Sequence, residues 1–389
     1  MRIARVLTRL NLGGPARQVM ASDPLLVERG HEVRVFAGVP GPGEGSLEEE
    51  LRALGVEVVP VPALRRGLSA LFTGGDLRAG AQLRRALAEF RPDIVHTHAA
   101  KAGAVGRRAA RRAVPGARRV HTFHGHVLEG YFPGPVSRLL CGVESRLARE
   151  THQVLAVSEA TAADLVRLGV TEAGEVRVVP PGVRLDALLN LPERRGGALR
   201  DQLSLHPDDV AIAVIGRLAP VKRTTMALDV FEDVATEFPT AHLLVAGDGG
   251  ERPRVEARRD RMPEAVRARV HLLGALQDVK PVHEAADVLL STSFAEGMPV
   301  AMIEAGAAAR PVVSTAVGGV PELVRSGITG LFGVDRASLA AALASLVGDE
   351  ALRLEMGGAA RDRVRAQHSD HALADRLEDV YARMLGSGE

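Results

Sequence analysis

The chain has 389 residues, of which 46% are hydrophobic, 25% charged and 3% aromatic, and its formal net charge is +1. These proportions are ordinary for a globular protein and argue against a disordered or fibrous chain. The length exceeds what one hydrophobic core usually supports, so we expect two domains.

The charge is distributed unevenly along the chain. Residues 1–182 contain 25 basic and 18 acidic residues, a balance of +7, whereas the remainder contains 24 and 30, a balance of −6. A basic N-terminal half is typical of a surface that contacts phosphates or an acidic membrane, although uneven solvated faces give similar counts. The scarcity of aromatic residues leaves few stacking platforms, so we expect no nucleic-acid partner.

Cys141 is the single cysteine of the sequence. An intramolecular disulfide and a thiolate zinc site are therefore excluded, and a reducing compartment is expected. The opening residues 1–10 lack the apolar core of a signal peptide, and no apolar run reaches about 18 residues. We therefore expect a cytoplasmic protein, either free or attached to the inner membrane face.

Short β-branched runs alternate with helical patterns in the first half. This rhythm predicts βαβ units and a doubly wound parallel sheet in an N-terminal Rossmann-like domain, 1–185. The expected helices include 75–90 and 159–169. The expected strands lie within 2–10, 31–38, 56–62, 93–98, 118–125, 153–158 and 176–182.

The same rhythm restarts after a segment rich in charge, glycine and proline, 186–207, which we expect to be a linker. A second doubly wound domain is predicted over 208–365, with strands within 210–216, 241–249, 269–275, 287–293 and 311–319. The last segment, 366–389, has helical apolar spacing. It either crosses back to the N-terminal domain or packs locally, and its pattern does not decide between them.

Two glycines, Gly13 and Gly14, follow the first strand and precede a helix. Such a turn allows a phosphate to approach free amides and the positive end of the helix dipole, but it is also compatible with a simple tight turn. The third glycine of a GxGxxG fingerprint is absent at the required spacing, which disfavours a nicotinamide-dependent dehydrogenase.

Three histidines, His121, His124 and His126, gather where a strand of the first domain is expected to end. Ligands of doubly wound domains bind at this edge. Metal coordination is disfavoured because no cysteine or paired carboxylate accompanies the histidines. The remaining interpretations are hydrogen bonding to a substrate hydroxyl or phosphate and a structural role.

His98 and Lys101 follow another strand end and are candidates for acceptor binding. Basic residues continue along the next expected helix. The four arginines at helical spacing, Arg107, Arg108, Arg111 and Arg112, would line one face that docks on anionic lipid or an acceptor phosphate, unless that face is simply solvated.

Lysine is rare in this sequence, occurring at Lys101, Lys222 and Lys280 alone among 49 basic residues. Lys222 and Arg217 lie directly after the first strand of the second domain. Two cations there would neutralise a diphosphate and stabilise the charge that develops as it leaves, or they are ordinary surface cations.

Glu296 and Glu304 are separated by seven residues around the start of a helix in the second domain. Their carboxylates are suited to accept hydrogen bonds from sugar hydroxyls, and the intervening amides to donate to phosphate. This spacing is also common on ordinary helix faces. The intervening loop consists of Gly297, Met298, Pro299 and Val300.

Taken in order, these segments resemble family 4 of the retaining glycosyltransferases, whose members have the GT-B fold and require no metal. The resemblance extends from LNLGGPARQ through HTFHGH, VLAVSEAT, GRLAPVK, LLVAGDG and the Glu-x7-Glu segment to VGGVPELVRSGITGLF. It implies two Rossmann-like domains facing each other across a cleft, with the acceptor on the N-terminal side and the nucleotide sugar on the C-terminal side.

By position, the resemblance implies that His124 lies beside the donor sugar and that Arg217 and Lys222 hold the diphosphate. Glu296 would bind sugar hydroxyls and Glu304 the ribose. The donor loops would consist of Gly13 and Gly14 in the first domain and Gly297, Met298, Pro299 and Val300 in the second. One departure from the family pattern is the VVPPGVRLDAL run, with Pro181 and Arg184, which affects the hinge or acceptor side.

The implied activity is transfer of a hexosyl or N-acetylhexosaminyl group from a UDP-sugar, or alternatively a GDP-sugar, to an acceptor hydroxyl with retention of configuration. The acceptor, lipid-linked or otherwise anionic, would belong to glycolipid, polysaccharide or glycosylated-metabolite synthesis, and neither cofactor nor metal would be needed. Two alternatives remain: a sugar-nucleotide epimerase of GT-B fold and a non-catalytic sugar-binding protein.

Overall fold

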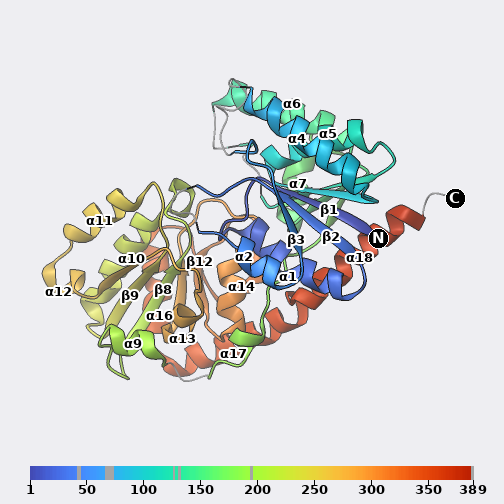
Figure 1. The fold of residues 1–389 in the computed structure, drawn as a ribbon. Helices are drawn as coiled ribbons and strands as arrows, with labels where there is room; N and C mark the ends of the chain where they lie inside the picture. The colour runs from blue at the N-terminus through green and yellow to red at the C-terminus, as the bar shows by residue number, and fades with distance from the viewer. Residues whose placement is uncertain (42–44, 66–73, 126–127, 130–132, 193–195, 387–389) are drawn as a thin grey trace. The chain divides into compact units, whose positions relative to one another are not determined.

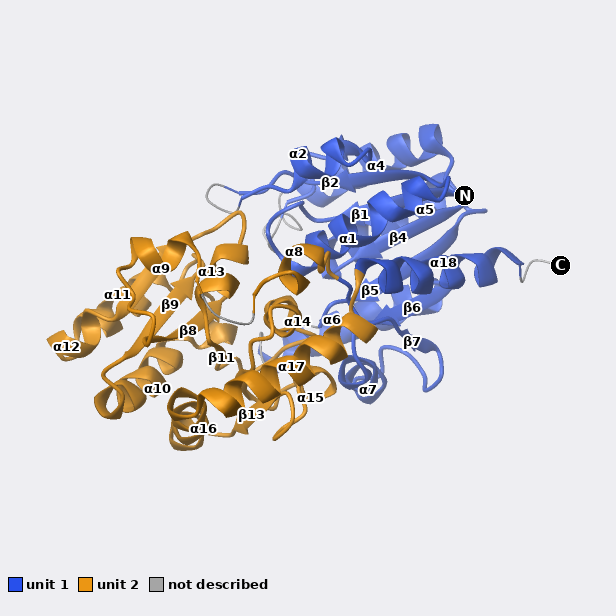
Figure 2. Ribbon diagram, turned by 90° about the horizontal axis from the view of Figure 1, so that it is seen from below, with its two compact units in different colours: residues 1–182, 370–389 blue, residues 183–369 orange. Residues whose placement is uncertain are grey.

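The computed structural model consists of two compact units (Figures 1 and 2). Unit 1 comprises Met1–Gly182 and Asp370–Glu389, and unit 2 comprises Val183–Ser369. The residues that the structure describes are 1–41, 45–65, 74–125, 128–129, 133–192 and 196–386.

Unit 1 is built on a parallel sheet whose strand order is β3-β2-β1-β4-β5-β6-β7 over the described residues. Every pairing in this sheet is parallel, as the βαβ rhythm predicts. The order reverses direction beside β1, so the carboxyl ends of β1 and β4 are where a doubly wound sheet binds ligands. The strands are β1 (Arg2–Leu7), β2 (Glu32–Ala37), β3 (Glu57–Pro60), β4 (Ile94–His98), β5 (Arg118–Phe123), β6 (Gln153–Ala156) and β7 (Val176–Val178).

Helices connect these strands and cover the sheet. In chain order they are α1 (Gly14–Glu28), α2 (Glu48–Ala53), α4 (Gly75–Phe90), α5 (Ala100–Ala113), α6 (Gly134–Arg149), α7 (Glu159–Arg167) and, from the end of the chain, α18 (Asp370–Gly386). Because successive side chains of a strand point to opposite faces, β1 contributes to two cores. Ile3 and Leu7 pack with residues of α1 and α18, whereas Ala4 and Val6 pack with those of α4 and α5.

The side chain of Arg5 also points from β1 toward α1 and α18, and it is fully buried. A buried guanidinium is tolerated only when its N–H groups are paired. Its Nη2 lies 2.8 Å from Oδ1 of Asp23 and 2.9 Å from Oγ of Ser22. Its Nη1 donates to the Tyr381 hydroxyl at 2.7 Å and to Nδ1 of His96.

Helix α18 packs against α1 within unit 1. Its apolar residues Leu373, Leu377, Val380 and Tyr381 recur at helical spacing and are all buried. Such a stripe stabilises a helix by burying it on a neighbouring face. Helix α18 therefore completes the core around Arg5. Its apolar spacing alone did not show whether it would pack there or against unit 2.

Unit 2 contains a second parallel sheet, ordered β10-β9-β8-β11-β12-β13 over its described residues. This is the 3-2-1-4-5-6 order of a doubly wound fold, with its reversal between β8 and β11. The strands are β8 (Val210–Ile215), β9 (Ala241–Ala246), β10 (Val270–Gly274), β11 (Val288–Ser291), β12 (Val312–Thr315) and β13 (Gly330–Gly333).

The helical elements of unit 2 cover its sheet and include a short 3-10 turn, η1, before α10. They are α8 (Asp186–Leu189), α9 (Ala198–Gln202), η1 (Pro220–Lys222), α10 (Thr224–Glu237), α11 (Arg252–Asp260), α12 (Glu264–Arg267), α13 (Lys280–Ala285), α14 (Val300–Ala307), α15 (Val320–Leu323), α16 (Arg336–Gly348) and α17 (Glu350–Gln367). The segment 186–207, expected to be a linker, thus contains α8 and α9 and belongs to unit 2. None of the described helices is both long and apolar enough to cross a membrane.

We expect Tyr381→Phe to lower the free energy of unfolding by about 1–3 kcal/mol, because it leaves a buried N–H of Arg5 without its acceptor. Chemical denaturation monitored by circular dichroism measures this change. Arg383→Gln is the matched control on the same helix. It removes an exposed ion pair with Asp379 and should lower the free energy of unfolding by less than about 1 kcal/mol. Equal losses in the two variants would contradict the role given to the Arg5 network.

Candidate active site

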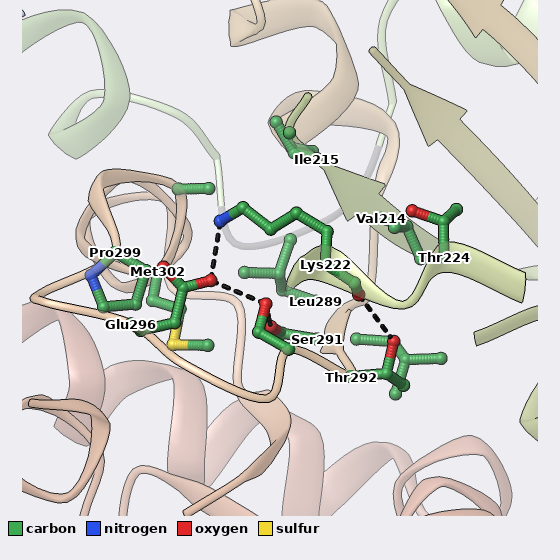
Figure 3. A pocket seen from close by; sticks show the side chains of 14 residues that line it. Val214, Ile215, Lys222, Thr224, Leu289, Ser291, Thr292, Glu296, Pro299 and Met302 are labelled. Atoms are coloured by element: carbon green, nitrogen blue, oxygen red, sulfur yellow. Dashed lines mark hydrogen bonds and ion pairs between the residues drawn. The ribbon is translucent and has the colours of Figure 1, made fainter. Parts of the chain in front are cut away.

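A pocket opens in unit 2 at the point where its strand order reverses (Figure 3). Its walls come from the carboxyl ends of β8 and β11, from η1 and from the loop leading into α14. Ligands of doubly wound sheets bind at this position because the neighbouring connections leave in opposite directions. The lining residues are Val214, Ile215, Gly216, Lys222, Thr224, Leu289, Leu290, Ser291, Thr292, Ser293, Glu296, Pro299, Ala301 and Met302.

An ion pair between Lys222 and Glu296 dominates the polar side of this pocket. Nζ of Lys222 lies 2.6 Å from Oε1 of Glu296 (Figure 3). Oγ of Ser293 donates to the same oxygen at 2.6 Å. The side chains of Lys222 and Glu296 are 30% and 11% exposed, so both are accessible from the pocket. The pocket thus holds a cation and a hydrogen-bond acceptor that are paired with each other.

Hydrogen bonds tie the loop that carries Lys222 to the loop that carries Glu296. The hydroxyl of Thr292 donates to the backbone oxygens of Lys222 and Arg223, at 3.1 and 2.9 Å. The amide of Phe294 donates to the backbone oxygen of Val221 at 3.0 Å. These bonds keep the ammonium and the carboxylate within reach of each other, a preorganisation that favours tight electrostatic binding.

Gly318 allows a close approach of two backbone segments behind Glu296. Its φ is +53°, and a Cβ built on it would lie 1.8 Å from the backbone oxygen of Glu296. The next amide, that of Gly319, donates to the same oxygen at 3.3 Å. Only glycine satisfies both the backbone angle and the space, so the glycine pair after β12 positions the Glu296 loop.

Helix α14 begins at this loop and presents its amino end to the pocket. The backbone oxygen of Pro299 accepts from the amides of Met302 and Ile303, at 3.1 and 3.4 Å. The amides of Val300 and Ala301, in the first turn, have no acceptor within the helix. Ala301 and Pro299 line the pocket, so this end of the helix is suited to an anion.

Five further candidates from the second domain are not among the residues that line the pocket: Arg217, Gly297, Met298, Val300 and Glu304. Arg217 is exposed. Glu304 is 4% exposed on α14, and its Oε2 lies 3.7 Å from Nε2 of His283. Lys222, Glu296 and Pro299 are therefore brought together around the pocket, whereas Arg217 and Glu304 are not among the residues that line it.

The N-terminal candidates lie at the corresponding edge of the unit 1 sheet. Gly13 precedes α1 as its N-cap, and its amide donates to Oδ1 of Asn11 at 3.3 Å, while Gly14 is the first residue of the helix. His98 is the last residue of β4, and His124 follows the last residue of β5. Nδ1 of His98 lies 2.9 Å from Nε2 of His124, so the fold brings these two histidines into direct contact.

More histidines lie beneath this pair. The ring of His96 stacks on that of His98, with centroids 4.3 Å apart, and its Nε2 lies 2.7 Å from the hydroxyl of Thr122. His121 contacts the hydroxyl of Thr97 through Nδ1 at 2.8 Å. His126 lies outside the described residues, as does most of the basic, apolar segment 62–72.

The four arginines of α5 do not share one exposed face as expected, because Arg107 is buried while Arg108, Arg111 and Arg112 are exposed. Arg107 is buried, and its Nη2 lies 2.5 Å from Oε2 of Glu144. Arg111 pairs with Glu150, likewise at 2.5 Å. Two of the four arginines are thus engaged with carboxylates of α6 and its end, because the apolar positions of α5 turn them toward that helix. Lys101 also has a partner, Asp76, at 2.8 Å.

Comparison with known proteins identifies the family. A model described as Glycosyltransferase Family 4 matches residues 12–187, and one described as Glycosyl transferases group 1 matches residues 209–349. The D-inositol 3-phosphate glycosyltransferase of Xylanimonas cellulosilytica is 30% identical over 392 residues, covering 95% of this chain and 92% of that protein. The chain belongs to glycosyltransferase family 4. The resemblance seen in its motifs is therefore confirmed.

A second relative and two solved structures are also similar to this chain over most of its length. The enzyme of the same name from Kineococcus radiotolerans is 30% identical over 394 residues, covering 95% of this glycosyltransferase and 85% of the relative. Among solved structures, Anabaena HepE in complex with UDP and glucose has a TM-score of 0.80 at 20% identity, covering 98% and 100% of the two chains. The structure of sucrose-phosphate synthase from Thermosynechococcus elongatus has a TM-score of 0.81 at 21% identity, and the match covers 100% of both chains. These structures confirm the GT-B fold.

Several residues that shape the glycosyltransferase pocket escaped the sequence analysis. Gly318 belongs to a segment quoted for the resemblance, and Thr292 and Ser293 end the predicted strand range 287–293, but no role was assigned to them. The polar run STS at the end of that range was the available signal. Their contacts with Glu296 and Lys222 join residues far apart in the chain, and periodicity carries no such information.

No group of three or more histidine, cysteine or acidic residues with metal-binding geometry occurs among the described residues.

Burial keeps four histidines of unit 1 neutral: His96, His98, His121 and His124. Desolvation, helped by the positive charge of Arg5, lowers the pKa of His124 from 6.5 to about 3. Burial likewise lowers the pKa values of His96, His98 and His121 well below 6.5. Because the folded state binds these protons less readily than the unfolded chain, the stabilisation is complete above about pH 6.5 and is lost as the pH falls toward 3.

We therefore expect the denaturant midpoint of the glycosyltransferase to fall progressively from pH 7 to pH 4. His124→Gln removes one of the groups that takes up a proton on unfolding, so its midpoint should fall less steeply across this range. His206→Asn replaces an exposed histidine and should leave the slope unchanged. Parallel slopes for His124→Gln and the wild type would show that His124 does not titrate differently in the two states.

Proposed function

We propose that this glycosyltransferase transfers a hexosyl or N-acetylhexosaminyl group from a nucleoside diphosphate sugar, preferentially a UDP-sugar, to an acceptor hydroxyl with retention of anomeric configuration. The observation that carries the proposal is the Lys222–Glu296 pair in the switch-point pocket of unit 2. UDP is the nucleotide in the solved structures of HepE, which supports testing uridine donors first.

The ion pair provides two complementary binding groups for such a donor. A diphosphate would compete for the ammonium of Lys222, since phosphate oxygens are strong acceptors for a charged donor. Glu296, released from Lys222 but still held by Ser293, would then accept hydrogen bonds from sugar hydroxyls. Substrate binding thus converts an internal ion pair into two contacts with the donor.

The charge of the diphosphate is proposed to be neutralised by protein groups without a metal. The first-turn amides of α14 point toward the pocket side of the helix, and amides together with the helix dipole favour phosphate. Lys222 adds one full positive charge beside them, and exposed Arg217, also after β8, would add a second. Such preorganised donors stabilise the charge that develops on a leaving diphosphate.

The remaining candidates are assigned by family resemblance. Glu304 would bind the ribose of the donor, and His124 would contact its sugar. Gly13 and Gly14, together with the amino end of α1, would approach a phosphate or the acceptor. His98 and Lys101 were expected on the acceptor side. In the structure His98 contacts His124 and Lys101 pairs with Asp76, so direct acceptor binding by either requires a change of partner.

The proposed step is a substitution on one face of the sugar. The bond from the anomeric carbon to the diphosphate oxygen breaks, and the acceptor oxygen forms a bond to the same carbon from the face that the diphosphate leaves. The acceptor proton passes to the departing phosphate oxygen, so no enzymatic base is required. Positioning and electrostatic stabilisation supply the acceleration in this scheme.

The acceptor class that we favour is a phosphorylated polyol. Inositol 3-phosphate appears in the names of the relatives that cover nearly the whole chain. A small anionic acceptor also agrees with the net positive charge of residues 1–182. A lipid-linked acceptor with peripheral membrane attachment is the alternative, although the pairing of Arg107 and Arg111 weakens the surface first expected to support it.

We expect a UDP-sugar at about 100 times its dissociation constant to stabilise the folded protein by about 2.7 kcal/mol, in EDTA and without added metal. Lys222→Ala should weaken donor affinity about tenfold to a hundredfold, because a charge-assisted contact is worth about 1.5–3 kcal/mol. Thermal-shift screening with UDP-, GDP-, ADP- and TDP-sugars, followed by calorimetric titration, measures both effects.

Lys280→Ala is the matched control, since this lysine lies on α13 and does not line the pocket. It should bind the donor as the wild type does. Equal binding by Lys222→Ala would rule out the pocket as the diphosphate site. A metal requirement for wild-type binding would overturn the metal-free arrangement.

With inositol 3-phosphate as acceptor, UDP-glucose and UDP-N-acetylglucosamine are the donors to compare. We expect one of them to give a glycosylated product with the anomeric configuration of the donor, identified by NMR coupling constants. An inverted product would contradict the proposed step. An isomeric nucleotide sugar formed without acceptor would instead indicate an epimerase, and donor binding with no product from any acceptor, including a lipid-linked one, would indicate a binding protein.

A further inference from the structure

His96, His98 and His124 form a connected set. The proton positions of these rings, and of His121 on the neighbouring strand, follow from their hydrogen-bond partners. The chain of contacts begins at Arg5, whose guanidinium can only donate. Its Nη1 contacts Nδ1 of His96, so that nitrogen must be the acceptor. His96 therefore carries its proton on Nε2 and donates it to the hydroxyl of Thr122, 2.7 Å away.

The contacts of His121 also determine which of its ring nitrogens carries the proton. The hydroxyl of Thr97 reaches the backbone oxygen of Val120 at 3.2 Å and Nδ1 of His121 at 2.8 Å. Both contacts are satisfied when the hydroxyl donates to the carbonyl and His121 donates from Nδ1. The opposite tautomer would forfeit one contact and bury an unpaired N–H at Nε2. What remains unpaired at His121 is thus a lone pair.

His98 also has two possible tautomers, with the proton on Nδ1 or on Nε2. Its Nε2 is buried and has no hydrogen-bond partner among the described residues, while its Nδ1 lies 2.9 Å from Nε2 of His124. If Nδ1 donates, the unpaired atom is again a lone pair, the arrangement already present at His121. If Nδ1 accepts, an N–H is left in a buried site without an acceptor, which costs the hydrogen bond that it made in water.

We propose that His98 is a positioning residue that donates from Nδ1 to Nε2 of His124 and so holds His124 with its proton on Nδ1. His124 then offers an N–H donor to its ligand. Building on the proposed function, the ligand atom is an oxygen of the donor sugar or of its phosphate, and His124 binds it as a neutral donor, not as a base.

Two features of the surroundings support this assignment. His98 is 2% exposed and its ring stacks on that of His96, which restricts rotation of the His98 ring away from His124. Burial also lowers the pKa values of both His98 and His124, which keeps each ring neutral with a single proton. A neutral pair joined by one hydrogen bond has only two tautomeric arrangements, and the unpaired Nε2 of His98 selects between them.

Nitrogen NMR of the substrate-free protein tests the assignment directly. With 15N-labelled histidine, and with His124→Phe to identify its signals among the 13 histidines, pyrrole-like and pyridine-like nitrogens are distinguished by chemical shift. We expect Nδ1 of His124 to be pyrrole-like and Nε2 pyridine-like. The reverse pattern in the wild type would overturn the proposal, whatever the kinetic effect of any variant.

Two substitutions at His98 then separate positioning from packing. His98→Asn places an amide N–H near the position of Nδ1 and should keep the His124 tautomer. His98→Leu removes the donor, so the two His124 nitrogens should move to averaged shifts. His206→Leu, at an exposed position, should change neither.

Kinetics supply the functional part of the test. We expect His98→Leu to lower kcat about tenfold, with a change of less than about threefold in KM for the donor, and His98→Asn to recover most of kcat. Equal kcat loss in both variants with unchanged nitrogen shifts would reduce His98 to a packing residue. If the wild type turns over no nucleotide sugar, the proposed function fails while the NMR result still decides the tautomer.

Discussion

Both units depend on the same constraint: a parallel sheet whose strand order reverses beside its first strand. At that point the chain leaves neighbouring strands in opposite directions, and loops from distant parts of the sequence meet at the carboxyl edge. In unit 2 the meeting strands are β8 and β11, and they bring Lys222 to Glu296. In unit 1 the reversal lies between β1 and β4, and His98 at the end of β4 meets His124, which follows the adjacent strand β5.

Each group of candidate side chains is held in place by contacts with neighbouring residues. Thr292 and Gly318 fix the loops of Lys222 and Glu296. Behind the histidines, the buried charge of Arg5 fixes the proton on His96, whose ring stacks on that of His98. Buried polar groups of this kind are costly unless fully paired, so their arrangement has little freedom. These contacts therefore restrict the orientations available to the candidate site residues.

The C-terminal helix shows how the two ends of the chain are coupled. Arg5 comes from the first strand and Tyr381 from the last helix, and the hydroxyl of Tyr381 lies 2.7 Å from the guanidinium and 2.6 Å from Nδ1 of His96. Folding of α18 onto α1 is therefore linked to the hydrogen bonding beneath His98. Side-chain contacts from Tyr381 through His96 thus reach His98 at the edge of the sheet.

The sequence by itself determined the parallel α/β architecture, the family and the segments that carry candidate residues, because hydrophobic periodicity and local motifs are properties of neighbouring residues. It did not determine which candidates meet. The pairing of Arg107 with Glu144, the burial of Glu304 and the place of α18 depend on contacts between residues distant in the chain. Only tertiary packing decides such contacts, since the face that a side chain turns to a neighbour depends on where that neighbour lies.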